Sequence, residues 1–156
     1  MIHYVFDLDD TLIIHKTKLM NYHMIQEDHS LKYQLSKCKG PCYIYTNGTG
    51  NHALTVLDKM KISNNFEKVY SRDTIPYMKP DYRSFNDVNN DISNRYPGPK
   101  SVFFFDDLLE NLETASGLGW LTFWIDPNYS HGKEYHYVNM SFPNIKECLL
   151  YLETKM

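Results

Sequence analysis

The stretch Val5–Leu12 reads V-F-D-L-D-D-T-L, and it decides how the rest of the chain is interpreted. An apolar run leads into three aspartates within four residues, Asp7, Asp9 and Asp10. Carboxylates placed so close together repel one another, and partial burial adds a desolvation cost. Such a group could serve solubility, form a polar turn, or bind a positively charged partner. The remaining sequence has to decide among these interpretations.

Length and composition predict one soluble domain that covers residues 1–156. A formal net charge of −3 gives no broad field that would draw the chain to nucleic acid or to a membrane. The longest apolar runs, Val102–Phe105 and Leu121–Ile125, are too short to span a bilayer. The N-terminus shows no signal-peptide pattern. Because Cys38, Cys42 and Cys148 include no C-x-x-C pair, we expect reduced thiols in a cytoplasmic protein.

Short β-branched and aromatic runs alternate with helical patterns along the chain. We expect strands at residues 2–6, 42–45, 66–70, 102–105 and 121–125. We expect helices at residues 28–37, 52–60, 80–92, 111–118 and 144–153. This alternation, with strands that are apolar throughout, predicts a parallel sheet covered on both faces. The expected fold is therefore α/β, a Rossmann-like three-layer sandwich around a central, mostly parallel sheet.

Polar residues stand where the expected strands end. The first strand ends at Asp7, the second at Thr46-Asn47-Gly48, the fourth at Asp106-Asp107 and the fifth at Asp126. In open parallel sheets, ligands bind beyond the carboxyl ends of the strands. We therefore expect these residues to gather at one functional edge of the sheet.

The acidic residues of this edge predict a metal site. Asp7, Asp9, Asp106 and Asp107 would repel strongly at one sheet edge unless a cation neutralised them. A small number of hard oxygen ligands suits Mg²⁺, which keeps several waters and is often completed by a substrate phosphate. Bound Mg²⁺ would explain why so many aspartates follow apolar strands.

Other residues of the same edge suit a phosphate group. Thr46 offers a hydroxyl at a strand end, and the flexible turn Asn47-Gly48 precedes a helix. Backbone N–H groups at such a turn can bind an anion. Lys79, in Met78-Lys79-Pro80-Asp81, supplies a positive point charge at the start of a helix.

The order of these motifs resembles that of the haloacid dehalogenase superfamily of phosphohydrolases. D-L-D-D-T is followed by a Thr that ends a strand, then by Lys-Pro before a helix, then by F-F-F-D-D. The segments T-N-G-T-G-N-H-A and F-F-D-D-L-L-E-N-L-E-T-A are similar to the pyrimidine 5′-nucleotidase-like branch. The size of the chain and F-F-D-D-x-x-x-N also resemble the small magnesium-dependent phosphatases of the superfamily.

The resemblance implies a role for each motif residue. Asp7 is implied as the nucleophile that forms an aspartyl-phosphate, and Asp9 as the general acid and base. The Asp9 carbonyl would also bind Mg²⁺, together with Asp7 and a carboxylate of the fourth motif. We favour Asp107 as the direct ligand, with Asp106 either direct or acting through water.

The remaining implied residues would hold the substrate. Thr46 and Lys79 would hold the phosphoryl oxygens. Further phosphate contacts are expected from Leu8, Thr11, Asn47 and Gly48. Thr11 would also form a hydrogen bond near Asp7.

The chain offers little or no room for a cap over this site. Only residues 12–41 separate the first two motifs, which excludes a separate helical cap of the kind found in many relatives. Two segments are candidates for a substitute lid. The first carries His15, Lys16 and Lys18, which could meet an anionic substrate. The second spans residues 126–137, whose aromatics could stack on a base. A solvated loop is the alternative for both.

These expectations lead to one main function and two alternatives. The main hypothesis is a magnesium-dependent phosphomonoesterase that acts on a small phosphomonoester, with a nucleoside monophosphate favoured. The first alternative is a phosphatase that acts on a phosphoprotein or a polynucleotide phosphate end, because the site is uncapped. The second is a phosphate-binding relative without turnover. No membrane partner is expected, and the oligomeric state is left open.

Overall fold

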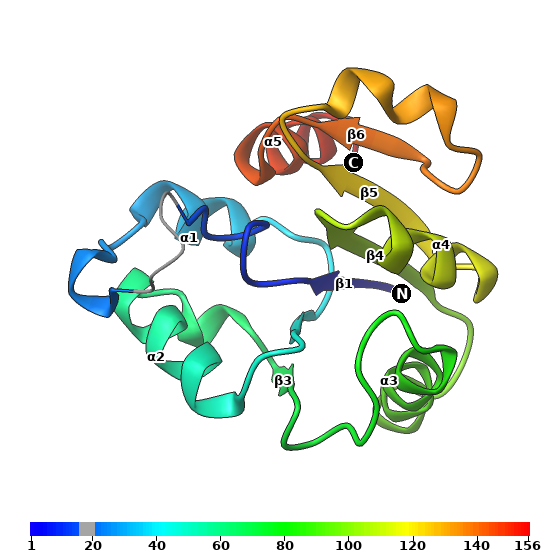
Figure 1. The fold of residues 1–156 in the computed structure, drawn as a ribbon, viewed down its shortest axis with the longest axis horizontal. Helices are drawn as coiled ribbons and strands as arrows, with labels where there is room; N and C mark the ends of the chain where they lie inside the picture. The colour runs from blue at the N-terminus through cyan, green and yellow to red at the C-terminus, as the bar shows by residue number, and fades with distance from the viewer. Residues whose placement is uncertain (16–20) are drawn as a thin grey trace.

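In the computed structural model, which describes residues 1–15 and 21–156, one parallel sheet forms the centre of the molecule (Figure 1). Within these residues the sheet has six strands, in the order β3-β2-β1-β4-β5-β6. The strands are β1 (Ile2–Phe6), β2 (Cys42–Tyr45), β3 (Lys68–Tyr70), β4 (Ser101–Asp106), β5 (Leu121–Ile125) and β6 (Met140–Phe142). Every neighbouring pair is parallel, so all six strands end at the same edge.

Five helices cover the two faces of this sheet within the described part of the chain. They are α1 (His29–Ser36), α2 (Gly50–Met60), α3 (Tyr82–Arg95), α4 (Leu109–Gly117) and α5 (Ile145–Lys155). The buried side chains of α1, α2 and α5 join one apolar cluster, and those of α3 and α4 join a second. Tyr4 and Phe6 belong to the first cluster and Val5 to the second, because successive strand residues point to opposite faces. The fold is therefore the predicted three-layer α/β sandwich.

Stacked aromatic rings support the centre of the sheet. Phe105 lies between Phe6 and Phe123, with ring centroids 4.5 and 4.8 Å away. Full burial of one such side chain contributes about 1.5–3 kcal/mol. Since Phe6 and Phe105 directly precede Asp7 and Asp106, this packing also fixes the carboxyl ends of the two central strands.

The predicted elements all exist, with shifts at their ends. Helix α2 begins at Gly50, because the Thr49 side chain accepts a hydrogen bond from the His52 N–H at 3.2 Å and caps the helix. Strand β6 was not predicted, because its three residues form a strand only by pairing with β5. All three cysteines are free, and Cys42 and Cys148 are buried.

The connection between β5 and β6 corrects the prediction of a lid over residues 126–137. It contains a 3₁₀ helix, Tyr129–Glu134, and then returns along β5 to the start of β6. The Tyr135 ring packs edge-on against Trp124 with centroids 5.8 Å apart, and the Thr122 hydroxyl donates to the Tyr137 carbonyl. The lid prediction is wrong for these two tyrosines, because they cover the face of the sheet.

The described residues between β1 and β2 contain only a 3₁₀ turn, Tyr22–Met24, and α1. This agrees with the prediction of a core without a cap. Lys16 and Lys18, predicted to meet an anionic substrate, lie outside the described residues. Among the residues that are described, no helix has both the length and the apolar character needed to cross a membrane.

Candidate active site

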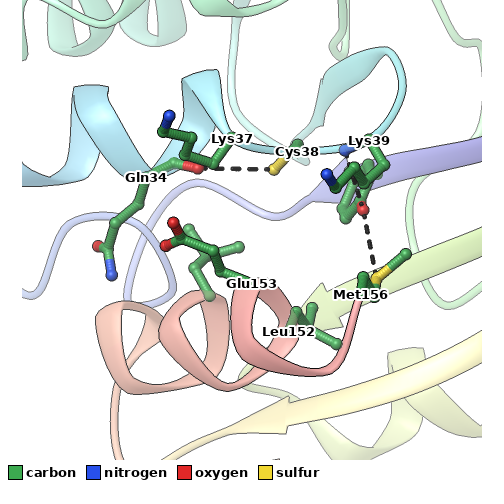
Figure 2. A pocket seen from close by; sticks show the side chains of 9 residues that line it. Gln34, Lys37, Cys38, Lys39, Leu152, Glu153 and Met156 are labelled. Carbon is green, nitrogen blue, oxygen red and sulfur yellow. Dashed lines mark hydrogen bonds between the residues drawn. The ribbon is translucent and has the colours of Figure 1, made fainter.

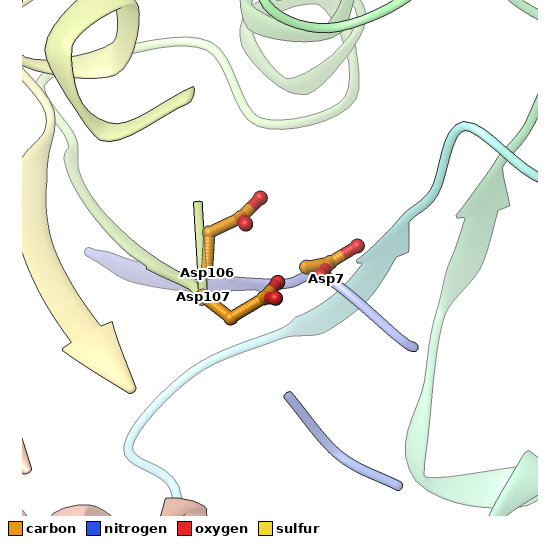
Figure 3. A group of neighbouring side chains, drawn as sticks. All are labelled: Asp7, Asp106 and Asp107. Atoms are coloured by element: carbon orange, nitrogen blue, oxygen red, sulfur yellow. The ribbon is translucent and has the colours of Figure 1, made fainter. Parts of the chain in front are cut away.

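Three carboxylates meet where the two central strands end (Figure 3). Strand β1 pairs with β4 through Phe6 and Phe105, so the residues that follow, Asp7 and Asp106, emerge side by side. Asp7, Asp106 and Asp107 each offer an oxygen, and these oxygens lie within 4.8 Å of one another. The parallel register thus joins two motifs that are separated by about two thirds of the chain.

Lys79 lies among these carboxylates and is itself buried. Its Nζ donates to Asp7 Oδ1 at 3.0 Å, to Asp106 Oδ2 at 3.0 Å and to the Tyr45 carbonyl at 2.8 Å. Burial alone would lower the pKa of Lys79, but the charges of Asp106 and Asp7 outweigh it and raise this pKa. Lys79 is therefore a permanent positive charge beside Asp7.

The side chain of Asn47 positions this lysine. Its Oδ1 accepts from the Lys79 N–H at 2.8 Å, and its Nδ2 donates to the Lys79 carbonyl at 3.1 Å. We predicted Asn47 as a phosphate ligand, but both ends of its side-chain amide are used by the Lys79 backbone. The backbone of Asn47 and the second N–H of its Nδ2 remain available for an anion.

The acidic residues carry more negative charge than Lys79 balances. Burial, followed by the charge of Asp106, raises the pKa of Asp7 to about 6. Burial and the same neighbour raise the pKa of Asp107 to about 9. One ammonium group faces three carboxylates, so a further cation would stabilise their ionised forms. Three carboxylate oxygens in one small cluster are also the ligands that Mg²⁺ prefers. The residues present therefore fit this metal.

Asp106 and Asp107 differ in how far their oxygens are already used. Asp106 is fully buried and accepts from Lys79, from Asn111 Nδ2 at 3.1 Å and from the Leu108 N–H at 2.9 Å. The Asp107 carboxylate is half-buried, and its contact with the Thr11 hydroxyl is long, at 3.5 Å. Asp107 is thus the more available metal ligand of the two.

Other predicted residues surround Asp7. The Thr11 hydroxyl donates to Asp7 Oδ2 at 3.0 Å, as expected for this motif. Thr46 is buried at the end of β2, and its Oγ1 accepts from the Gly48 N–H at 3.0 Å. The side chain of Leu8, predicted to contact phosphate, is fully buried in the apolar core. Leu8 can therefore reach a ligand only through its backbone.

Asp9 lies apart from the three carboxylates and contacts two histidines. His52 Nε2 lies 2.9 Å from Asp9 Oδ1, and His15 Nε2 lies 2.6 Å from the same oxygen. The predicted partner of His15 was an anionic substrate, and His52 was not predicted as a site residue. The only signal for His52 was its position in T-N-G-T-G-N-H-A, in the first turn of α2.

Two hollows lie outside the acidic cluster. A small cavity of about 10 Å³ lies between α1 and the end of α5 (Figure 2), where Tyr4 donates to Met156 Sδ at 3.7 Å. It contains none of the predicted site residues. A larger hollow of about 630 Å³ begins beside Thr11 and His15 and extends to Met60 and α5. Two of its lining residues, His15 and Asn21, are the described residues on either side of residues 16–20.

Comparison with known proteins relates the chain to others through its fold. No protein-family model matches the sequence, and no curated protein matches it either. Among solved structures, the chain is similar to L-2-haloacid dehalogenase from Xanthobacter autotrophicus. The TM-score is 0.65 at 12% identity, over 86% of this chain and 64% of that one. It is also similar to the candidate HAD hydrolase YfnB from Bacillus subtilis bound to magnesium, with a TM-score of 0.64 at 17% identity, over 80% and 55%.

A third similar structure is the core domain of a candidate phosphoglycolate phosphatase from Streptococcus pneumoniae. The TM-score is 0.65 at 15% identity, over 97% of this chain and 95% of that one. The chain thus spans about two thirds or less of the first two structures but nearly all of an isolated core domain. These similarities show the haloacid dehalogenase fold, in the form of its core without a cap.

Proposed function

We propose that this protein is a magnesium-dependent phosphomonoesterase that acts through an aspartyl-phosphate on Asp7. The observation that carries the proposal is the position of Asp7. Its carboxylate accepts a hydrogen bond from the buried ammonium of Lys79 and lies close to the carboxylates of Asp106 and Asp107. A nucleophile in this position has a positive charge beside it and room for a cation next to it. Such an arrangement suits an attack on an electron-rich phosphoryl group.

In the first step, a carboxylate oxygen of Asp7 attacks phosphorus and the bond from phosphorus to the ester oxygen breaks. The leaving oxygen takes a proton from Asp9, which acts as a general acid. The positive charge of Lys79 stabilises the phosphoryl oxygens, and the Thr46 hydroxyl and nearby backbone N–H groups hold them while negative charge shifts among them. The products of this step are the free alcohol and phosphorylated Asp7.

In the second step, water replaces the Asp7 oxygen on phosphorus. Asp9, now ionised, accepts a proton from the attacking water, and the bond between Asp7 and phosphorus breaks. Inorganic phosphate leaves, and Asp9 is protonated for the next cycle. One residue thus serves as acid and then as base, which requires its carboxylate to be near the substrate in both steps.

Asp7 and Asp107, with the Asp9 carbonyl, would hold Mg²⁺, and Asp106 would support Lys79. The metal supplies charge neutralisation between the nucleophile and the incoming phosphoryl oxygens. The donor set fits, because the cluster is all oxygen and Asp107 has an available carboxylate. Magnesium bound to YfnB is consistent with this assignment.

The substrate we favour is a small phosphomonoester, first a nucleoside monophosphate. Support comes from the resemblance of T-N-G-T-G-N-H-A and F-F-D-D-L-L-E-N to the nucleotidase-like branch. One observation favours the alternative of a macromolecular phosphate. Large apolar side chains adjacent to the motif residues, Met78, Tyr82 and Leu108, are about half exposed, at 47, 58 and 47%. An open, partly apolar rim of this kind can accept a larger surface.

The test is phosphate release from a panel of nucleotides, small phosphomonoesters, phosphopeptides and 3′-phosphorylated oligonucleotides, with Mg²⁺ and with EDTA. Wild type is compared with Asp7→Asn and with Asp58→Asn, which alters an exposed aspartate on α2. We expect metal-dependent release that Asp7→Asn abolishes and Asp58→Asn leaves unchanged. Folded, metal-loaded protein that releases phosphate from no member of the panel would reject catalysis and leave a phosphate-binding role.

A further inference from the structure

Two histidines from separate segments hold the carboxylate of Asp9. His52 Nε2 lies 2.9 Å from Asp9 Oδ1 and 3.1 Å from Oδ2, and His15 Nε2 lies 2.6 Å from Oδ1. Behind His52, the Tyr22 hydroxyl lies 2.8 Å from His52 Nδ1. We propose that His52, fixed by Tyr22 and assisted by His15, is a positioning residue that aims Asp9 at the leaving oxygen. This inference rests on the proposed function, because it assigns Asp9 its acid–base role.

The donors and acceptors fix the orientation of the His52 ring. A carboxylate only accepts hydrogen bonds, so His52 presents an N–H at Nε2 to Asp9. In the neutral imidazole, Nδ1 is then an acceptor, and the Tyr22 hydroxyl is the donor that satisfies it. The Asp9 carboxylate thus selects the tautomer of His52, and Tyr22 holds the ring from its other side, in the same way that outer partners orient histidines in other sites.

The two histidines also distinguish the two oxygens of Asp9. Oδ1 lies 2.9 Å from His52 Nε2 and 2.6 Å from His15 Nε2. Oδ2 has only the longer contact with His52 Nε2, at 3.1 Å. Oδ2 is therefore the oxygen that is free to carry a proton to the substrate. The Asp9 side chain is 34% exposed, so its carboxylate is accessible to a substrate.

Local structure places each of these residues. His52 is in the first turn of α2, where the Thr49 cap fixes its backbone. The turn after β1 passes through Asp10, which has a left-handed φ of 62°, and Asp10 Oδ1 accepts from the His15 N–H at 3.1 Å. Aspartate tolerates this conformation better than most residues. The turn therefore brings His15 back onto Asp9, next to the helix that supplies His52.

The position of His52 next to Asp9 leads to a specific prediction for the enzyme kinetics. A general acid matters most when the leaving group is a poor one, and it contributes roughly 10²–10⁴-fold in rate. Loss of a residue that only orients the acid should remove part of this factor, about 10- to 100-fold. The loss should be large for alkyl phosphates and small for p-nitrophenyl phosphate. A general disturbance of the fold would instead lower kcat/KM equally for all substrates.

The experiment measures kcat/KM for p-nitrophenyl, phenyl and alkyl phosphates in wild type, His52→Ala, His52→Gln and Tyr22→Phe. We expect His52→Ala to follow the leaving-group pattern of Asp9→Ala with a smaller amplitude. His52→Gln, which can restore an N–H donor, should recover part of the loss. The exposed residues His29 and Tyr33 give matched controls, His29→Ala and Tyr33→Phe, which should leave all rates unchanged.

A second readout does not depend on turnover. Imidazole nitrogen NMR shifts should show His52 with its proton on Nε2, and Tyr22→Phe should change the Nδ1 signal. A proton on Nδ1 in the wild type would overturn the inference, as would equal losses for all leaving groups in His52→Ala. Active wild type with an unaffected His52→Ala rejects this inference alone. Wild type inactive on the whole panel rejects the proposed function and this inference together.

Discussion

At the scale of single residues, the site is held together by opposite charges that do not balance. Lys79 offers one positive charge to Asp7 and Asp106, and both ion pairs have N–O distances of 3.0 Å. Breaking a buried pair on one side leaves an uncompensated charge and is strongly destabilising. Asp107 has no cationic partner among the described residues, and burial, followed by the charge of Asp106, raises its pKa to about 9. In the proposed site this carboxylate would serve metal binding at the expense of stability in the metal-free protein.

Replacing Asp107 should separate these two effects. We expect Asp107→Asn to stabilise the metal-free protein by on the order of 1 kcal/mol at neutral pH, after allowance for solvent screening. The same change should abolish the magnesium-dependent rate, because an amide is a weaker ligand than a carboxylate. Urea unfolding in EDTA and phosphate release in Mg²⁺ measure the two effects. Glu110→Gln, in the exposed first turn of α4, is the control. A destabilised metal-free variant would contradict the charge argument.

At the scale of elements, the start of α1 is linked to the start of α5 through Asp28. Asp28 caps α1 by accepting from the Leu31 N–H at 3.1 Å, and its Oδ1 lies 2.9 Å from Lys146 Nζ. Burial acts to raise the pKa of Asp28, but hydrogen bonds from Lys146, Leu31 and Ser30 outweigh it and lower this pKa below 3.8. A depressed folded-state pKa adds stability that is present above the unfolded-state value and is lost as the pH falls through the folded-state value.

Substitution of Asp28 should therefore have a pH-dependent cost. We expect Asp28→Ala to cost about 1 kcal/mol at neutral pH, because it removes a helix cap and a partly exposed ion pair. Near pH 3 the cost should be smaller by roughly the contribution of the charge. Asp28→Asn, which keeps a capping oxygen, should cost less than Asp28→Ala at neutral pH. Urea unfolding at the two pH values tests this, and an identical cost at both would reject the role of the charge.

At the scale of the whole molecule, the acidic cluster proposed to bind Mg²⁺ exists only when the sheet is formed. Asp7 ends β1 and Asp107 follows β4, and they meet because these strands are neighbours despite their separation in sequence. An unfolded chain has no such cluster, so Mg²⁺ should bind the folded state selectively. Selective binding raises stability by about 2.7 kcal/mol when the free ligand is a hundredfold above its Kd.

Thermal unfolding should report this linkage. We expect saturating Mg²⁺ to raise the Tm by roughly 5–10 °C relative to EDTA, given about 2–4 °C per kcal/mol for a chain of this size. Asp7→Asn should reduce the shift, and the same concentration of K⁺ should produce little change. Equal Tm values in Mg²⁺ and EDTA would show that the acidic cluster does not bind this metal.

The sequence was sufficient to predict those features that depend only on residues close together in the chain. Continuous apolar runs identified β1, β2, β4 and β5, because strands buried on both faces tolerate few polar residues. Asp7 and Asp107 follow strands, and Lys79 stands in a short motif. Their place in the candidate site could therefore be predicted from residue type and from the order of the motifs along the chain. The absence of room for a cap followed from the short span between the first two motifs.

Tertiary structure alone decided which partners these residues have. Strand β6 depends on pairing with β5, and Tyr135 packs on Trp124 because the chain has to return to the start of β6. Asn47 was predicted to contact phosphate, yet its side chain holds the Lys79 backbone. The contact between His52 and Asp9 joins residues 43 positions apart, which no local pattern specifies. Sequence by itself determined the elements and the reactive groups, because propensity and burial act over a few residues. The folded sheet determined their pairing, because long-range contacts depend on how all the elements pack.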